Sequence, residues 1–155
     1  MKVEFINPFV SAAFMVLEKF GKQATKGNLR LTPSPIEGKE VNTVVGVTGD
    51  VLGQVIYSMS TETALNIASL MLMGMPVEDL DEISKSAVSE LGNIITGNAA
   101  TELGNNGFSC NVTPPTLFMG KDVKVSVKDV QILVIPILSD LGEITIYVAL
   151  RESDQ

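Results

Sequence analysis

Residues 86–97 read Ser-Ala-Val-Ser-Glu-Leu-Gly-Asn-Ile-Ile-Thr-Gly, and this pattern predicts the middle of a long helix. At about 100° per residue, the apolar side chains gather on one face and the polar ones form a stripe on the other. The apolar face comprises Leu80, Ala87, Val88, Leu91, Ile94, Ile95 and Ala99. The stripe comprises Ser86, Glu90, Asn93 and Gly97, flanked by Ser89, Thr96 and Ala100. We therefore expect a helix that buries one side and presents one carboxylate and one carboxamide on the other.

Gly92 and Gly97 lie inside this helical pattern. Glycine costs about 1 kcal/mol relative to alanine in a helix interior, so its use here indicates a purpose. One interpretation is that close packing inside the molecule requires the glycines and that Glu90 is an ordinary solvated residue. The other is that they, with Ser89, keep the outer face slim enough for another protein to approach. The pattern leaves both interpretations open.

The helix should begin at Glu78 or Asp79 and end near Leu103, because a Gly-Asn-Asn-Gly run follows at residues 104–107. Its start, Asp79-Leu80-Asp81, has the Asp-x-Asp form of phosphatases that use an aspartate nucleophile. Such a motif needs an apolar strand before it, and here Gly-Met-Pro precedes it at residues 74–76. Acidic residues at the positive end of a helix dipole explain these side chains better.

Two more helices are expected. An N-terminal helix should start with Asn7 as its cap and Pro8 at its first position, and it should close at Gly21. A second helix should start with Ser60 or Thr61 as its cap and run to Gly74, and Pro76 should end it. Four methionines in or next to this segment should fill gaps in the core: Met59, Met71, Met73 and Met75.

The remaining segments predict strands. Alternating or continuous apolar residues place them at 29–32, 41–48, 51–59, 109–113, 123–127, 130–138 and 143–150. The segment 130–138 is more uniformly apolar and should be buried on both faces or at an interface, with an edge or bulge at Pro136. Along the last strand, Ile144, Ile146, Val148 and Leu150 should face one way. We expect an α+β fold, with a largely antiparallel sheet and long helices packed on one face, in a single domain over residues 1–155.

Composition excludes several classes of function. The net charge of −7 argues against nucleic acid and against anionic membranes, since both require clustered basic residues. The absence of histidine removes the usual general base and the commonest metal ligand. A single cysteine, Cys110, permits no intrachain disulfide and favours a reducing compartment. The segment 63–77 is too short and too interrupted to span a bilayer, so we expect a cytoplasmic protein.

The spacing Ser86-x3-Glu90-x2-Asn93 resembles the signature of the CheC/CheX/FliY phosphatases of bacterial chemotaxis, which has Asp or Ser, then Glu, then Asn. The similarity extends over most of the chain and to the overall CheC-like fold. Further matching segments are Leu91-Gly92-Asn93 followed by Gly97, Thr113-Pro114-Pro115-Thr116, and residues 46–49, 56–60 and 62–65.

The resemblance implies hydrolysis of the aspartyl phosphate on a CheY-like response regulator. It implies catalytic roles for Glu90 and Asn93 and contacts to the partner from Ser86, Ser89 and Gly97. Asn93 would hold the attacking water and Glu90 would pair with a lysine of the partner. The protein would need no metal or cofactor of its own, because the response regulator carries Mg²⁺. The CheX branch of the family also implies a homodimer.

Two alternatives stay open. The chain could be a non-catalytic module that binds a response regulator, or a scaffold related to flagellar switch proteins. Separately, Glu4-x2-Asn7 repeats half of the signature and could form a second site. Pro8 biases Asn7 away from helical angles, so Glu4 and Asn7 need not share a helical face, and we expect one site per chain.

Overall fold

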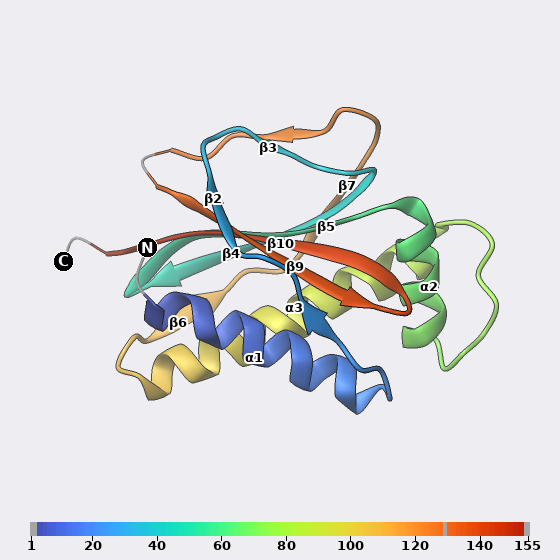
Figure 1. The fold of residues 1–155 in the computed structure, drawn as a ribbon, viewed down its shortest axis with the longest axis horizontal. Coiled ribbons are helices and arrows are strands. Elements are labelled where there is room, and N and C mark those ends of the chain that lie inside the picture. Colours follow the sequence, from blue (N-terminus) through green and yellow to red (C-terminus); the bar gives the residue numbers. More distant parts are fainter. Residues whose placement is uncertain (1–2, 129, 154–155) are drawn as a thin grey trace.

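The computed structural model describes residues 3–128 and 130–153, and it is built from one large antiparallel sheet with three helices on one face (Figure 1). Our one-domain prediction covers residues 1–155, of which 1, 2, 129, 154 and 155 lie outside the described part. The helices are α1 (Val3–Lys19), α2 (Thr61–Met71) and α3 (Glu82–Asn105). The α+β class with helices on one face of a largely antiparallel sheet is confirmed.

The large sheet has the strand order β1-β9-β10-β5-β4-β6, with β2 also pairing β9 and β7 also pairing β4. Its strands are β1 (Thr25–Lys26), β2 (Arg30–Thr32), β4 (Val41–Gly49), β5 (Val51–Met59), β6 (Cys110–Val112), β7 (Thr116–Met119), β9 (Ile132–Ser139) and β10 (Gly142–Glu152). The short strands β3 (Ile36–Glu37) and β8 (Lys124–Val125) pair separately. The hairpin of β4 and β5 and the strand β10 confirm the predicted strands. The predicted strand at 123–127 is shorter, because it pairs only with β3.

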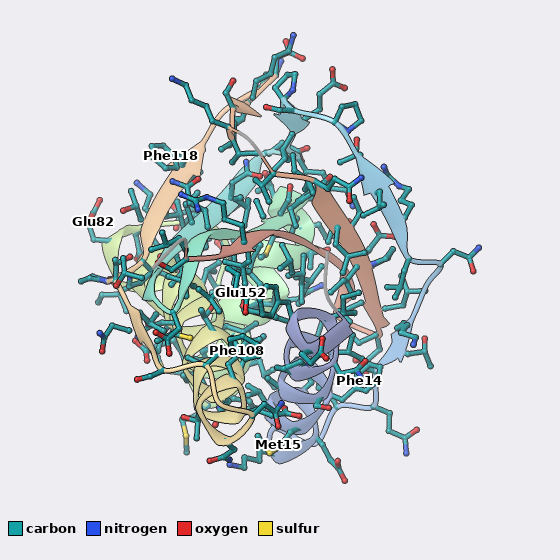
Figure 2. The ribbon with its side chains drawn as sticks, turned by 90° about the vertical axis from the view of Figure 1, so that its left-hand side faces the viewer. Phe14, Met15, Glu82, Phe108, Phe118 and Glu152 are labelled. Carbon is teal, nitrogen blue, oxygen red and sulfur yellow. The ribbon has the colours of Figure 1, made fainter. Side chains whose placement is uncertain are left out.

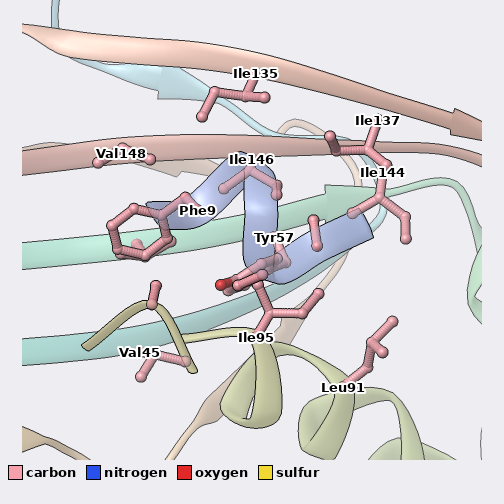
Figure 3. Close-up of a cluster of buried hydrophobic side chains, with 14 of the residues drawn as sticks. Phe9, Val45, Tyr57, Leu91, Ile95, Ile135, Ile137, Ile144, Ile146 and Val148 are labelled. Atoms are coloured by element: carbon pink, nitrogen blue, oxygen red, sulfur yellow. The ribbon is translucent and has the colours of Figure 1, made fainter. Parts of the chain in front are cut away.

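The main core lies between the sheet and the helices. Alternate residues of β10 point into it, and the four that the alternation predicted are all buried there: Ile144, Ile146, Val148 and Leu150. Leu91 and Ile95 of α3 and Phe9 of α1 meet them from the other side (Figure 3). The apolar side chains recur every second residue in the strand and about every 3.6 residues in the helices. Both sets therefore meet in one buried layer.

A second, smaller apolar cluster covers the opposite face of the sheet. It consists of Ile36, Ile56, Ile132, Val134, Tyr147 and Ala149, under the loops that carry β3 and β8. In β9, Leu133, Ile135 and Ile137 face the main core, while Ile132 and Val134 face this second cluster. Burial on both faces explains why β9 is continuously apolar, and it confirms that prediction.

Pro136 lies at an interruption of the neighbouring strands, and not at the expected edge or bulge. On one side β9 pairs with β10 throughout, and on the other side β2 and β1 pair with it before and after Pro136. Between those two strands, the Gly27 N–H donates to the Pro136 carbonyl at 2.9 Å. Proline has no N–H to offer a partner strand, so it is tolerated where the outer strand is broken.

Helix α1 begins before Asn7, so the predicted cap at Asn7 is wrong. Pro8 lies inside the helix and is buried with Phe5 and Phe9 on the face that packs into the core. This burial stabilises a helix whose Pro8 lacks the N–H for one internal hydrogen bond. As a consequence, Glu4 and Asn7 lie three residues apart in one continuous helix, are both exposed and do share a helical face, although the sequence did not require it.

Helix α2 begins where predicted, because the Ser60 hydroxyl accepts a hydrogen bond from the Thr63 N–H at 3.1 Å. Met59 is buried as expected, but the core role predicted for Met73 and Met75 is wrong. Their side chains are 95% and 64% exposed. They follow the end of α2, where Met73 has a φ of 63°, so the chain leaves the helix axis and carries both side chains into solvent.

Candidate functional site

Helix α3 starts at Glu82, three or four residues later than predicted. The Asp81 carboxylate caps it by accepting a hydrogen bond from the Ser84 N–H at 2.9 Å. This bond also lowers the pKa of Asp81 below its ordinary value. The acidic residues before the helix therefore serve its N-terminus, as expected. The helix then runs alongside α1 and across the sheet, in contact with β4, β5 and β7.

The inner face of α3 agrees with the predicted apolar arc and adds to it. Val88, Leu91, Ile95 and Ala99 are buried against the main core, with Ala87 and Ile94 partly buried at its margin. Leu80 precedes the helix but also packs there. Thr96, expected to flank the outer stripe, is fully buried against the sheet, because its hydroxyl bonds to Tyr57 at 2.7 Å.

Gly92 and Gly97 occur in the helix for different structural reasons. A Cβ at Gly92 would lie 2.9 Å from Cδ2 of Tyr57 and 3.3 Å from Cγ2 of Thr43, so close packing against the sheet requires this glycine. This corrects the interpretation that Gly92 thins the outer face. A Cβ at Gly97 would meet no atom within 4 Å, and Gly97 is half-buried on the outer side. Of the two glycines, only Gly97 therefore fits the interpretation that glycine keeps the outer face of the helix slim enough for another protein to approach.

The predicted stripe is present on the outer face of α3. Ser86 and Glu90 are exposed, while Ser89, Asn93 and Gly97 are half-buried. In the described residues, neither Glu90 nor Asn93 has a side-chain hydrogen bond or ion pair with another residue. A carboxylate and a carboxamide thus lie one helical turn apart with their bonding capacity free for a partner.

A groove of about 580 Å³ runs beside this stripe. One wall is the first half of α3, and the other is the segment that contains β7; Figure 2 shows Glu82 of α3 and Phe118 of β7 on the same side of the molecule. Its lining comprises Glu82, Lys85, Ser86, Ser89 and Glu90 from α3, with Pro115, Leu117 and Met119 from the other wall. Three of the predicted site residues therefore line one groove, next to an apolar wall.

The apolar wall was not predicted, although Thr113 and the prolines after it were noted in the sequence. The Thr113 hydroxyl accepts from the Gly46 N–H at 2.8 Å, and the Thr113 N–H donates to the Gly46 carbonyl at 2.9 Å. These bonds hold the chain at the edge of β4 before β7 pairs with the same strand, for example Leu117 with Thr43. The pairing brings Leu117 beside α3, which no local pattern indicates.

Ile83 is another residue that the sequence reasoning missed. It precedes Ser86 by three residues and Glu90 by seven, so it lies on the same outer face. Its side chain is 68% exposed. The signal was available, since a large apolar residue outside the apolar arc is unusual on a solvated helix.

Clusters of metal-ligating side chains and membrane-spanning helices are both absent from the described residues. Among them, no group of three or more His, Cys, Asp or Glu side chains is placed to hold a metal ion. Within residues 3–128 and 130–153, no helix is both long enough and apolar enough to cross a membrane. The charged pair in the groove, Lys85 with Glu82 at 3.5 Å, is an exposed contact within one helix.

Known proteins share both the sequence and the fold. The family described as chemotaxis phosphatase CheX matches residues 41–138. CheY-P phosphatase CheX from Thermotoga maritima is 35% identical over 132 residues, or 81% of each chain. The crystal structure of the CheX–CheY–BeF3–Mg²⁺ complex from Borrelia burgdorferi has a TM-score of 0.80 at 34% identity, covering 97% of this chain and 100% of that one. A CheC-like superfamily protein from Shewanella sp. PV-4 has a TM-score of 0.86 at 27% identity, covering 97% and 99%.

The matched region contains the features described above. It includes α3 with its free Glu90 and Asn93, and it includes the wall formed by β7. The match extends over more than half of the chain, and the Thermotoga relative agrees along most of both sequences. This chain belongs to the CheX family of chemotaxis phosphatases.

Proposed function

We propose that this protein hydrolyses the aspartyl phosphate of a phosphorylated CheY-like receiver domain, with the outer face of α3 entering the partner's site. The activity class follows from the family, whose members include a CheY-P phosphatase. One observation carries the assignment to α3: Glu90 and Asn93 lie one turn apart with free side chains on a helix whose other face is buried, and Glu90 lines an open groove.

The chemistry suits a site without histidine or a resident metal. In the hydrolysis, a water oxygen bonds to phosphorus while the bond from phosphorus to the aspartate oxygen breaks, which releases inorganic phosphate and the carboxylate. An acyl phosphate is already activated, and we propose that the partner's own Mg²⁺ and lysine balance its charge. This chain then has to supply a positioned water more than a strong base or a nucleophile.

Asn93 is proposed to hold that water in line with the bond that breaks. A carboxamide has one acceptor oxygen and two N–H donors but no useful basicity, so its contribution is orientation. A hundredfold effect on rate corresponds to about 2.7 kcal/mol of transition-state stabilisation, which one well-placed side chain supplies. The half-buried position of Asn93 favours this role, since its orientation is restrained by the helix around it.

Glu90 is proposed to pair with the partner's active-site lysine and so set the register of docking. A charge-assisted hydrogen bond of this kind is stronger than a neutral one. Glu90 is exposed and lines the groove together with Ser86 and Ser89. Those two small side chains, and Gly97 two turns beyond Glu90, are proposed to let the partner's backbone approach the helix.

The proposal is tested by the single-turnover decay of a phosphorylated CheY-type receiver domain with and without this protein. We expect faster decay with the protein, and we expect the acceleration to disappear in the Asn93→Ala variant. Binding to receiver domains without acceleration of decay would instead support the non-catalytic module or the switch-like scaffold. Several predictions of the sequence stay predictions: a homodimer, which sedimentation would reveal, a cytoplasmic location, and the absence of a nucleic-acid partner, of a membrane partner and of a metal or cofactor of its own.

A further inference from the structure

A chain of two hydrogen bonds connects the sheet to the turn of α3 that carries Glu90 and Asn93. Tyr57 of β5 is buried between the sheet and α3 (Figure 3). Its hydroxyl oxygen lies 2.7 Å from Oγ1 of Thr96, and Oγ1 of Thr96 lies 2.8 Å from the carbonyl oxygen of Gly92. The Gly92 carbonyl sits between Glu90 and Asn93 in the helix.

The direction of both bonds follows from the available protons. The Gly92 carbonyl can only accept, so the single hydroxyl proton of Thr96 is donated to it. The bond between Tyr57 and Thr96 must then use the phenol proton, with Thr96 as acceptor. Burial raises the pKa of Tyr57 well above its ordinary value, so the phenol keeps that proton. The order of donation is Tyr57 to Thr96 to Gly92.

Packing holds the same turn from below. The ring of Tyr57 and the methyl group of Thr43 lie directly under Gly92, where a Cβ would be only 2.9 Å from the ring. The helix backbone therefore rests on the sheet at this point. A hydroxyl that bonds to the carbonyl four residues earlier also alters the local bend of a helix. The two hydrogen bonds thus set how this turn is rotated and curved above the sheet.

We infer that Tyr57 and Thr96 are positioning residues for the reaction, which hold the turn of α3 in the orientation that aims Asn93 at the attacking water. This inference rests on the proposed function and adds residues that do not themselves touch the substrate. A role in packing alone would need only the ring of Tyr57, since phenylalanine fills the same space. The inference requires the hydroxyl groups, because a small displacement of a positioned group is costly in rate.

The experiment measures receiver-domain dephosphorylation over a range of concentrations of this protein, which separates the maximal rate from the half-saturating concentration. We expect Tyr57→Phe and Thr96→Val each to lower the maximal rate about tenfold, with the half-saturating concentration changed less than about twofold. Thr96→Ser keeps the hydroxyl and should restore a rate close to that of the wild type.

Thr101→Val is the matched control. Thr101 lies on the same helix and its hydroxyl also bonds to a carbonyl four residues earlier, that of Gly97 at 3.1 Å. Thr101 is exposed and its bond has no connection to the sheet. We expect this variant to leave both kinetic parameters unchanged. An equal loss in Thr101→Val, or an unchanged maximal rate in both Tyr57→Phe and Thr96→Val, would overturn the inference.

Amide hydrogen exchange measured on the same variants tests the positioning role without relying on phosphatase activity. The Thr96 N–H donates within the helix to the Gly92 carbonyl, which also accepts from the Thr96 hydroxyl, so its exchange should accelerate in Tyr57→Phe more than in Thr101→Val. A wild-type protein that fails to speed receiver decay overturns the phosphatase assignment for this partner. Exchange at residues 93–97 that is the same in Tyr57→Phe and wild type overturns the positioning role in either case.

Discussion

Helices α1 and α3 lie side by side on the same face of the sheet, and each carries a glutamate three residues before an asparagine. Glu4, Asn7 and Glu90 are exposed, while Asn93 is half-buried. The spacing of glutamate and asparagine is therefore the same in both helices, although only α3 also has the serine of the signature, Ser86. The two pairs differ in the residues that surround them. This difference shows that a motif becomes a candidate site only when the neighbouring structure holds its side chains in place and leaves room for a partner.

The turn with Asn93 is held tightly. Gly92 rests on Tyr57, and the groove with its apolar wall lies beside Glu90. On α1, Asn7 is followed by Pro8, which cannot donate the hydrogen bond that would close the preceding turn. A cavity of about 590 Å³ borders α1, but its lining from Phe14 to Thr25 lies at the other end of the helix. The comparison favours α3 as the site that acts on a partner.

The largest effect is expected from Asn93→Ala. Loss of the carboxamide should lower the maximal dephosphorylation rate at least a hundredfold, on the order of 2.7 kcal/mol, because the water is no longer oriented. Binding to the phosphorylated receiver should stay within about twofold. Asn105→Ala, the same change at the exposed end of α3, is the control for helix stability. Near-normal turnover in Asn93→Ala would remove the main distinction between α3 and α1.

Gly92→Ala tests the support beneath the site. A Cβ placed 2.9 Å from the Tyr57 ring forces the helix and sheet apart. We expect a loss of about 2 kcal/mol in the free energy of unfolding, measured by chemical denaturation. Gly97→Ala is the matched control, since its Cβ meets no atom within 4 Å. There the gain in helix propensity should leave stability equal or higher by up to about 1 kcal/mol. Equal stabilities for both variants would contradict the close contact.

Glu90→Ala should weaken docking as well as turnover. Removal of one charge-assisted hydrogen bond to the partner's lysine should lower affinity for the phosphorylated receiver about tenfold, equivalent to about 1.4 kcal/mol. Calorimetric titration with a stable phosphoryl analogue on the receiver would measure it. Glu102→Ala, on the same helix but beyond the groove lining, provides the control. Unchanged affinity in Glu90→Ala would show that an ion pair between Glu90 and the partner's lysine does not set the register of docking.

The smallest effect is expected from Asn7→Ala. Helix α1 contains no glycine that could rest on the sheet, and Pro8 removes one of its internal hydrogen bonds, so the dephosphorylation rate should change by less than about twofold. The measurement is the same single-turnover assay used for Asn93→Ala. A loss of tenfold or more would mean that α1 carries a second active face, and the comparison drawn above would fail.

Much of the fold was predictable because it depends on local patterns. Alternation along β10, the hairpin of β4 and β5, and the Ser60 cap all follow from interactions within a few residues. The stripe of Ser86, Glu90 and Asn93 follows from helical geometry in the same way. Gly92 was predictable too, since it follows Val88 by four residues and precedes Ile95 by three on the buried arc. That signal was present, but the sequence analysis left open whether Gly92 served close packing or a slim outer face.

The sequence by itself therefore determined the three helices, the long strands, most of the buried face of α3 and its outward stripe, but not the short strands β1, β3 and β7. Tertiary structure alone decided what those elements meet. Strand β7 pairs with the distant β4 and so forms the apolar wall. Burial of Phe5 and Phe9 stabilises α1 as a continuous helix despite Pro8. The hydroxyl of Tyr57, which lies in the sheet, forms a hydrogen bond with Thr96 of α3. These contacts join segments far apart in the chain, and their free energy exists only once the core has formed, so no local pattern encodes them.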